Sequence, residues 1–106
     1  MVFSSPTALP SISLGTTLSP IIGQDCIIDD LSLVNIDSVD RNVTIKDGSG
    51  RVYEPLFTVP AGTRQLLALS ASQVAQGVFF ARGLWMSASV AGVIDVWVSA
   101  RLKAPQ

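Results

Sequence analysis

Few side chains in this sequence could carry out catalysis. The chain of 106 residues has no histidine and a single cysteine, Cys26. It therefore cannot assemble a Ser-His-Asp or Cys-His catalytic set, or the usual zinc site of cysteine and histidine ligands. Because Ile27 and Ile28 follow Cys26, we expect a buried thiol in a chain suited to a reducing compartment. We expect no enzyme activity, no cofactor and no metal.

Three acidic or polar motifs remain. Asp29 and Asp30 are adjacent, so on a strand they point to opposite faces and make a poor acid/base pair; a solvated bulge or turn before Leu31 is expected instead. Residues 47–50, DGSG, lack the spaced carboxylates of an EF-hand and the lysine of a P-loop, which predicts a β-turn. Residues 42–44 match a glycosylation sequon, but the N-terminus has no basic region or unbroken apolar run typical of a secretory signal, so we treat the sequon as chance.

The charges are sparse and scattered. The formal net charge is −1, and the seven basic residues occur singly, so the sequence has no electrostatic footprint for nucleic acid. Lys46 with Asp47 and Arg101 with Asp95 are expected as weak surface ion pairs. Charged residues make up only 14% of the chain, and the mean hydropathy is +0.48. This composition predicts buried contacts between subunits, and we take a homotrimer as the first hypothesis.

The stretch from Leu84 to Leu102 organises the expected fold. Apolar or small side chains recur at every second position on both sides of residues 90–92, which predicts two strands. A three-residue loop with Gly92 in the left-handed conformation would pair Ala88 with Ile94, Met86 with Val96 and Trp85 with Trp97. We therefore expect a hairpin with one apolar face. Its period of two, and Asp95 near its middle, are not those of a membrane-spanning helix.

The expected pairing puts Trp85 and Trp97 side by side on the outer face of the hairpin. Aromatic side chains on a sheet face can be covered as core, anchor a protein interface or stack on sugar rings. Few polar groups accompany the two rings to orient a ligand, so core or subunit interface is favoured over sugar binding.

The first 25 residues form an expected N-terminal arm. Pro6, Pro10 and Pro20 favour extended backbone over helix, and alternation around Ile12 and Leu14 predicts a short strand. Extended arms have little to pack on within a small domain of their own, so we expect residues 1 to about 20 to contact a neighbouring subunit. The apolar candidates for this contact are Phe3, Ile12 and Leu14.

Residues 26–106 form the expected folded domain. Further strands are predicted over 26–36, 43–46, 52–59, 64–69 and 78–81. Pro55 removes a backbone donor, so its strand belongs at a sheet edge or a bulge. Capping-box spacing from Ser70 and a closing Gly77 predict one short helix between them. Short strands punctuated by Gly and Pro predict an all-β, antiparallel two-sheet β-sandwich, jelly-roll-like, with an extended N-terminal arm.

Four segments of the chain together resemble small β-sandwich structural proteins of tailed-bacteriophage virions. They are Asn42–Gly50, Phe57–Gly62, Gly83–Ser89 and Ala91–Val93, and they span roughly the C-terminal two thirds of the chain. The resemblance implies a role in capsid decoration (cement), in the neck or tail, or in a fibre, usually as a symmetric oligomer. It carries over no individual site residue.

These observations lead to one expected function. The chain is expected to be a non-enzymatic virion structural protein, made in the host cytoplasm, that decorates and stabilises a phage capsid. Its expected partners are copies of itself and the major capsid protein or other virion proteins, with no nucleic acid and no membrane. The alternatives are a neck, tail or fibre component, or a carbohydrate-binding β-sandwich module that uses Trp85 and Trp97.

Overall fold

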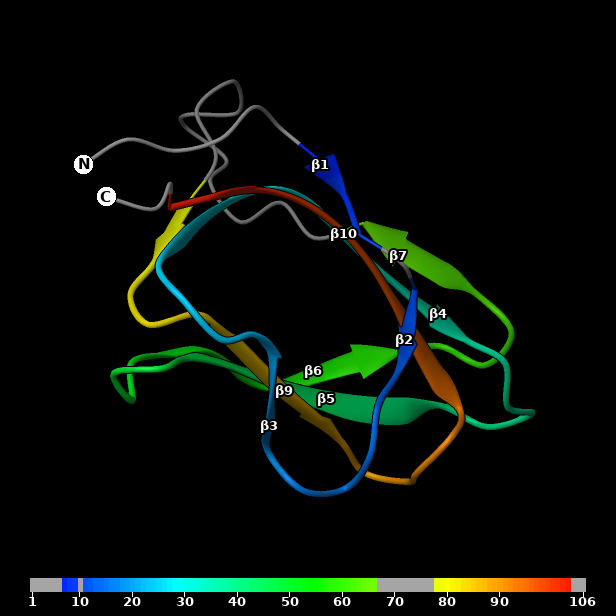
Figure 1. Cartoon of the computed structure of the whole chain (residues 1–106). Helices are drawn as coiled ribbons and strands as arrows, with labels where there is room; N and C mark the ends of the chain where they lie inside the picture. Colours follow the sequence, from blue (N-terminus) through cyan, green and yellow to red (C-terminus); the bar gives the residue numbers. More distant parts are fainter. Residues whose placement is uncertain (1–6, 10, 67–77, 104–106) are drawn as a thin grey trace.

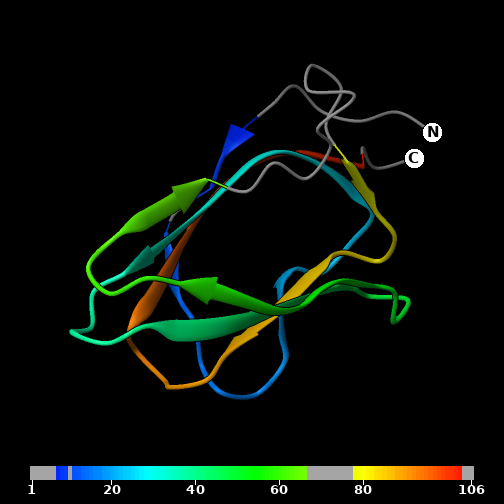
Figure 2. The same cartoon turned by 180° about the vertical axis from the view of Figure 1, so that it is seen from behind.

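The computed structural model describes residues 7–9, 11–66 and 78–103, and this part of the chain folds into two antiparallel β-sheets (Figure 1). Seen from behind, the sheets form two layers that face each other (Figure 2). The all-β, two-sheet prediction is therefore confirmed. No helix occurs within the described ranges. The helix predicted between Ser70 and Gly77 lies outside the described residues.

The first sheet has six strands. Its order is β1–β10–β4–β7, with β2 also pairing with β10 and β8 with β4. The strands are β1 Thr7–Ala8, β2 Ile12–Ser13, β4 Cys26–Asn35, β7 Arg64–Leu66, β8 Val78–Phe80 and β10 Ile94–Leu102. The pairing with β4 follows the whole of β10, so these two long strands form the centre of the sheet.

The second sheet has four strands in the order β3–β9–β5–β6. They are β3 Ser19–Ile22, β5 Arg41–Asp47, β6 Val52–Val59 and β9 Leu84–Ala88. The register of β6 shifts between its pairings with Val43 and Ile45. The prediction that Pro55 confines its strand to an edge or a bulge is confirmed on both counts, because a proline cannot donate a bond to the ladder.

The predicted hairpin between β9 and β10 is wrong. Gly92 is left-handed as expected, with φ +82°, but β9 pairs with β3 and β5, whereas β10 pairs with β4, β1 and β2. The loop between them crosses from one sheet to the other. The loop after β2 contacts the loop between β9 and β10, since the Ala88 amide donates to the Gly15 carbonyl and the Gly92 amide donates to the Leu14 carbonyl.

Side-chain alternation is as predicted although the pairing is not. Leu84, Met86 and Ala88 face the core from β9, and the alternate residues of β10 face it from the other sheet. Two facing strands in different sheets bury the same side chains as a hairpin with one apolar face would. The buried core comprises Leu14, Ile22, Cys26, Ile28, Leu31, Leu33, Val43, Ile45, Val59, Phe80, Leu84, Met86, Ala88, Ile94, Val96, Val98 and Ala100.

The segment expected as an N-terminal arm pairs within its own chain where it is described. β1 and β2 pair with β10, and β3 pairs with β9. Leu14 and Ile22 are buried in the core. An arm separate from the sandwich is thus not confirmed, because the open edges of β10 and β9 offer this segment backbone partners inside the domain.

The adjacent carboxylates Asp29 and Asp30 lie at a β-bulge, as predicted. Ser99 pairs with Asp30 and Ala100 with Ile28, which leaves Asp29 as the extra residue. Arg101 forms an ion pair with Asp29, with 2.9 Å between Nη2 and Oδ1. The expected pair of Arg101 with Asp95 is wrong, since six residues along a strand separate them by about 20 Å.

Gly83 marks a close approach of two strands of the second sheet. Its φ is +111°, a conformation that side-chain-bearing residues avoid. A Cβ at this position would lie 1.8 Å from the Ile22 carbonyl oxygen. Only glycine therefore allows the start of β9 to pack against the end of β3.

A buried amide joins the two sheets at one end of the sandwich. Asn35, at the end of β4, is 0% exposed. Its Nδ2 donates to the carbonyls of Val39 and Val59, each at 2.9 Å, and its Oδ1 accepts from the Asp37 amide at 2.8 Å. Val59 ends β6 in the opposite sheet, so this single side chain fixes β4, the following loop and β6 together.

We expect Asn35→Ala to lower the free energy of unfolding by about 3 kcal/mol, because it leaves two carbonyls and an amide without their partner. Urea unfolding followed by circular dichroism measures the loss. The matched control is Asn42→Ala, which removes only an exposed bond with Thr58 and is expected to cost about 0.5 kcal/mol. Equal stabilities for the two variants would contradict the role assigned to Asn35.

Candidate functional site

The two tryptophans lie on opposite outer faces of the sandwich. Trp85, on β9, faces outward between Pro20 of β3 and Lys46 of β5. Trp97, on β10, faces outward from the other sheet and is 46% exposed. The predicted side-by-side pair is therefore wrong, because it depended on the β9–β10 hairpin. Trp85 is half-buried, and its Nε1 is enclosed with no hydrogen-bond acceptor among the described residues.

The three interface candidates expected in the arm have different surroundings. Ile12, on β2, is 38% exposed. Leu14 is 3% exposed and belongs to the core, with its amide bonded to the Ile94 carbonyl at 2.8 Å. Phe3 lies outside the described residues. Of these three, only Ile12 presents apolar surface to solvent in the described part of this chain.

A shallow recess lies beside the exposed indole of Trp97. We call it the Trp97 recess; its volume is about 160 Å³, and its lining consists of Ala8, Leu9, Asp30, Ser32, Trp97, Val98 and Ser99. Strand pairing explains this gathering: Ser32 is opposite Trp97, and Asp30 is opposite Ser99. On the β1 side, Ala8 is opposite Ser99. Residues from three strands thus meet on one outer face.

Arg64 holds the Trp97 ring from the β7 side. Its guanidinium carbon lies over the indole, 5.6 Å from the ring centroid. Arg64 is opposite Val34 on β4, one row along from the Ser32–Trp97 pair. A cation–π contact of this kind at an exposed site contributes about 0.5–1 kcal/mol. Arg64 therefore covers part of the exposed Trp97 ring.

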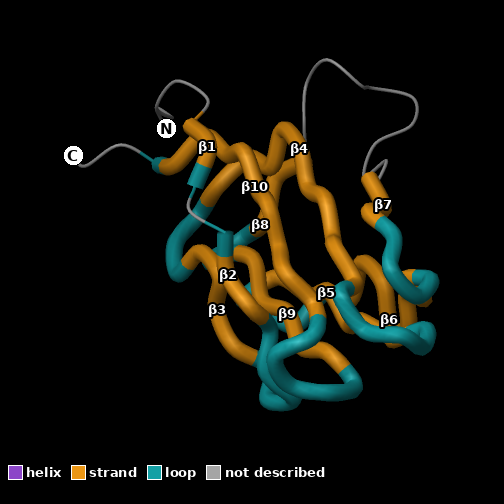
Figure 3. The backbone as a smooth tube through the Cα atoms, turned by 90° about the vertical axis from the view of Figure 1, so that its right-hand side faces the viewer, coloured by secondary structure: helices purple, strands orange, loops and turns teal. Residues whose placement is uncertain are grey.

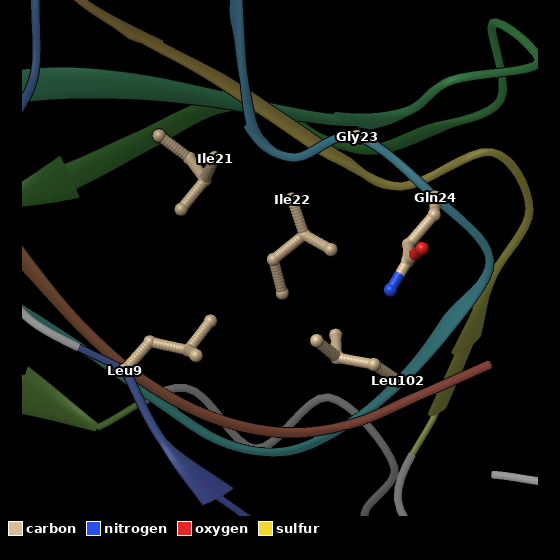
Figure 4. A pocket seen from close by; sticks show the side chains of 6 residues that line it. All are labelled: Leu9, Ile21, Ile22, Gly23, Gln24 and Leu102. Atoms are coloured by element: carbon tan, nitrogen blue, oxygen red, sulfur yellow. The ribbon is translucent and has the colours of Figure 1, made fainter. Parts of the chain in front are cut away.

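A second candidate is the apolar cleft at the end of the sandwich (Figure 4). Ile21 and Ile22 point into it from the β3 side, and Leu9 and Leu102 point into it from the β1 and β10 side. Gly23 and Gln24 complete the lining, and the volume is about 390 Å³. The Gln24 amide is the one polar side chain among these six, so the cleft offers a ligand apolar contact and little orientation.

The third candidate surface follows the edge where β6 and β7 lie on the same side of the molecule (Figure 3). Leu56 on β6 is 66% exposed and Leu66 on β7 is 69% exposed. Ile36, in the loop after β4, is 63% exposed, and its neighbour Asn35 bonds the Thr63 carbonyl in the β6–β7 turn. We call these three residues the β6–β7 edge. They are the large apolar side chains with the highest exposure in the described ranges.

The single thiol of the chain, Cys26, is buried. Burial, assisted by the nearby Asp25 carboxylate, raises the pKa of the Cys26 thiol to about 12, which keeps it protonated near neutral pH. No group of three or more His, Cys, Asp or Glu residues that could hold a metal occurs in the part of the chain that the structure describes. Within the same ranges, no helix has the length and apolarity needed to cross a membrane.

The DGSG segment is a β-turn between β5 and β6, as predicted. The Gly50 amide donates to the Asp47 carbonyl at 3.3 Å. The Asp47 carboxylate accepts from the Ser49 amide, the Ser49 hydroxyl and the Arg51 amide. The expected ion pair of Lys46 with Asp47 is wrong, because adjacent strand residues face opposite ways and this carboxylate turns inward to its own loop.

Two features of these surfaces were not singled out from sequence. Leu56 and Leu66 both lie in predicted strands. The sequence signal for the exposure of Leu56 is the neighbouring Pro55, which indicates an edge strand. Leu66 lies in β7, which is the edge strand of its sheet. Asp30 and Ser32 were assigned to the strand before β5, but their proximity to Trp97 depends on the β4–β10 register, which alternation alone does not give.

Comparisons with protein-family models, curated proteins and solved structures found no significant match.

We expect the hydrogen bonds that the Asp47 carboxylate accepts in its turn to make the stability of the fold depend on pH. Burial raises the pKa of Asp47, but the hydrogen bonds from Ser49 and Arg51 outweigh it and hold the pKa below the ordinary value of 3.8. A carboxyl group with a lowered folded pKa stabilises the fold above its unfolded pKa, and this contribution is lost as the pH falls through the folded pKa.

Thermal unfolding of the wild type and Asp47→Asn tests this dependence. At neutral pH the variant should be less stable by about 1 kcal/mol, since charge-assisted bonds become neutral ones. The difference should shrink as the pH falls below 3.8. A difference that stays constant through this range would show that the charge of Asp47 does not contribute.

Proposed function

We propose that this chain is a non-enzymatic structural protein of a tailed-bacteriophage virion and that it decorates the capsid as a cement protein. The observation that carries the proposal is the β6–β7 edge, where three large apolar side chains are each more than 60% exposed. Large apolar side chains with this exposure along one side of the molecule support a protein contact there. The resemblance of four turn-and-strand segments to phage β-sandwich proteins supplies the virion context.

The strand order supports a jelly-roll classification. If β1 and β2 are taken as one interrupted strand along β10, and β7 and β8 as one along β4, each sheet has four strand positions. Every connection between consecutive positions crosses between sheets except β5 to β6, which forms a hairpin. Eight positions wound in this way make two Greek keys, the jelly-roll arrangement found in viral capsid and lectin domains.

Low charge supports association with repeated neighbours. Only 14% of the residues are charged, against about 25% in ordinary soluble domains. We propose a homo-oligomer, with a trimer as the first hypothesis, in which Leu56, Leu66 and Ile36 are covered by a neighbouring chain. Many small apolar contacts repeated over a shell give strong total binding without any catalytic group.

Two alternatives belong to other classes. A neck, tail or fibre component would use the same edge in an assembly of lower copy number. A carbohydrate-binding module that uses Trp85 and Trp97 together does not fit their placement on opposite outer faces.

Quantitative mass spectrometry of purified virions tests the assignment to the particle. Decoration predicts a copy number comparable to that of the major capsid protein, because a cement protein repeats with the shell lattice. A much lower copy number would instead assign the chain to the neck, tail or fibre. Absence from washed particles would contradict a virion role.

The double variant Leu56→Arg, Leu66→Arg tests the contact surface. We expect it to raise the dissociation constant for self-association at least about tenfold, because a charge cannot be buried unpaired in an apolar interface. Light scattering coupled to size-exclusion chromatography measures the mass. Its stability should change little, since both side chains are already exposed.

Thr16→Arg is the control, because Thr16 is exposed in the loop after β2 and lies on neither β6 nor β7. It adds a charge and should leave the assembly intact. A wild-type chain that runs as an 11.2 kDa species at micromolar concentration, or a double variant with unchanged mass, would contradict the proposed contact.

A further inference from the structure

The free side of β6 is the one long strand edge that the sandwich leaves open in the part of the chain that the structure describes. β6 ends the second sheet, with β5 on one side and no described strand on the other. It has eight residues, whereas the other edge strands, β1, β2, β3, β7 and β8, have two to four. Short edge strands are one means by which proteins avoid pairing with another chain. β6 lacks this protection.

Hydrogen bonds of β5 show which backbone groups of β6 point inward. The Ser89 amide donates to the Asn42 carbonyl at 2.9 Å, so the backbone groups of Asn42 point toward β9. Because these groups alternate along a strand, those of the next residue, Val43, point toward β6. Val43 is opposite Phe57. The amide and carbonyl of Phe57 therefore point toward β5 and are used within the sheet.

The residues on either side of Phe57 turn their backbone groups to the free edge. By the same alternation, the amide and carbonyl of Leu56 and of Thr58 point away from β5. Both residues are exposed, and these backbone groups form no hydrogen bond with another described residue. Free amides and carbonyls spaced in this way are a template for another extended strand.

A second copy of β6 matches this template. When two antiparallel β6 strands are centred on Phe57, Leu56 of each copy is opposite Thr58 of the other. Each of these pairs exchanges two hydrogen bonds, which uses every free backbone group of both residues. Because one segment supplies both sides, the contact has twofold symmetry and closes without a third copy. We propose that β6 pairs with β6 of a second copy in this register.

Pro55 does not prevent this pairing. A proline on an edge strand removes a donor and commonly blocks a partner strand. In the proposed register, Pro55 is opposite Val59 of the second copy, and alternation from Phe57 turns the backbone groups of Val59 toward β5. The Val59 carbonyl also accepts from Asn35 Nδ2 of its own chain at 2.9 Å. The missing amide of Pro55 therefore removes no bond between the copies.

Side chains favour a copy of the same strand as the occupant. Leu56, which is 66% exposed, would lie diagonally from Leu56 of the second copy at about 7–8 Å, within reach of long side chains. Residues 56–59 carry no charge, so the pairing places no like charges opposite each other. Charged side chains on an edge commonly prevent such pairing, and this segment has none.

This inference rests on the proposed self-association at the β6–β7 edge and specifies how that contact forms. Leu56, one of the three residues that define the edge, lies next to the centre of the pairing. A twofold contact joins copies in pairs, so the assembly contains an even number of copies. The pairing is therefore incompatible with the trimer taken as the first hypothesis, and the two predict different masses.

Thr58→Pro tests the pairing at the backbone. Proline removes an amide that points to the free edge and so breaks no bond with β5. It removes the bonds that the two Thr58 amides donate across the contact, and we expect the dissociation constant to rise at least about tenfold. Thr58→Ala is the matched control, because it removes the same hydroxyl but keeps the amide, and it should associate like the wild type. Light scattering coupled to size-exclusion chromatography measures the mass of each chain.

The outcomes separate this inference from the proposed function. An even-numbered assembly that Thr58→Pro dissociates and Thr58→Ala preserves supports the pairing. An assembly with an odd number of copies, or one that the two variants weaken equally or not at all, overturns the pairing but not self-association. A wild-type chain that remains at 11.2 kDa overturns both.

Amide hydrogen exchange of the wild type gives a second test that does not depend on the folding of a variant. The Leu56 and Thr58 amides should exchange at least about tenfold more slowly in the assembly than in a dilute, dissociated sample, because they become hydrogen-bonded. Thermal unfolding confirms that both Thr58 variants are folded. Equal exchange of these amides in the two samples would overturn the pairing even if Thr58→Pro does not fold.

Discussion

The buried amide of Asn35 is the interaction on which the arrangement of the two sheets depends. Asn35 is the last residue of β4 in one sheet. Its side chain donates a hydrogen bond to the carbonyl of Val59, the last residue of β6 in the other sheet, and also bonds with the loop that follows β4. Both Nδ2 hydrogens and one of the two acceptor positions of Oδ1 are used, so an aspartate of the same shape, which has no donor when ionised, cannot replace Asn35. A one-residue slip of β4 would turn Asn35 outward and Val34 inward, and would leave these bonds unmade. The amide therefore fixes register and inter-sheet connection at once.

This register determines which surfaces the sandwich presents. With β4 and β10 fixed along their length, Asp30 and Ser32 lie beside Trp97 on one outer face. The crossing from β9 to β10 sends Trp85 to the opposite face. Leu56 and Leu66 are exposed on β6 and β7, edge strands of different sheets that follow each other along the chain. Leu66 lies across from Ser32, which is itself opposite Trp97, so the exposed leucine of β7 and the indole share this outer face.

Alternation made the strands and their inward faces predictable, and local turn chemistry made the Asp29 bulge, the Asp47 turn and the edge position of Pro55 predictable. Pairing was not predictable in the same way. Leu84, Met86 and Ala88 bury equally well in a hairpin with β10 or in a sheet that faces it, so the pattern fits both. Which of the two pairings forms depends on residues distant in sequence, because the Leu14 and Gly15 carbonyls accept hydrogen bonds from the Gly92 and Ala88 amides where the chain crosses from β9 to β10. Asn35 could have been noticed, since it continues the inward series of Leu31 and Leu33, but its partners in β6 could not.

The separation of β9 from β10 is the claim from which the surfaces follow, and nuclear Overhauser effects measure it directly. The account predicts cross-strand contacts between the backbone protons of Trp97 and Ser32 and between those of Trp85 and Lys46, which are paired residues of β10–β4 and β9–β5. These protons approach closely only in neighbouring antiparallel strands. Cross-strand contacts between Trp85 and Trp97, with none between Trp97 and Ser32, would contradict it.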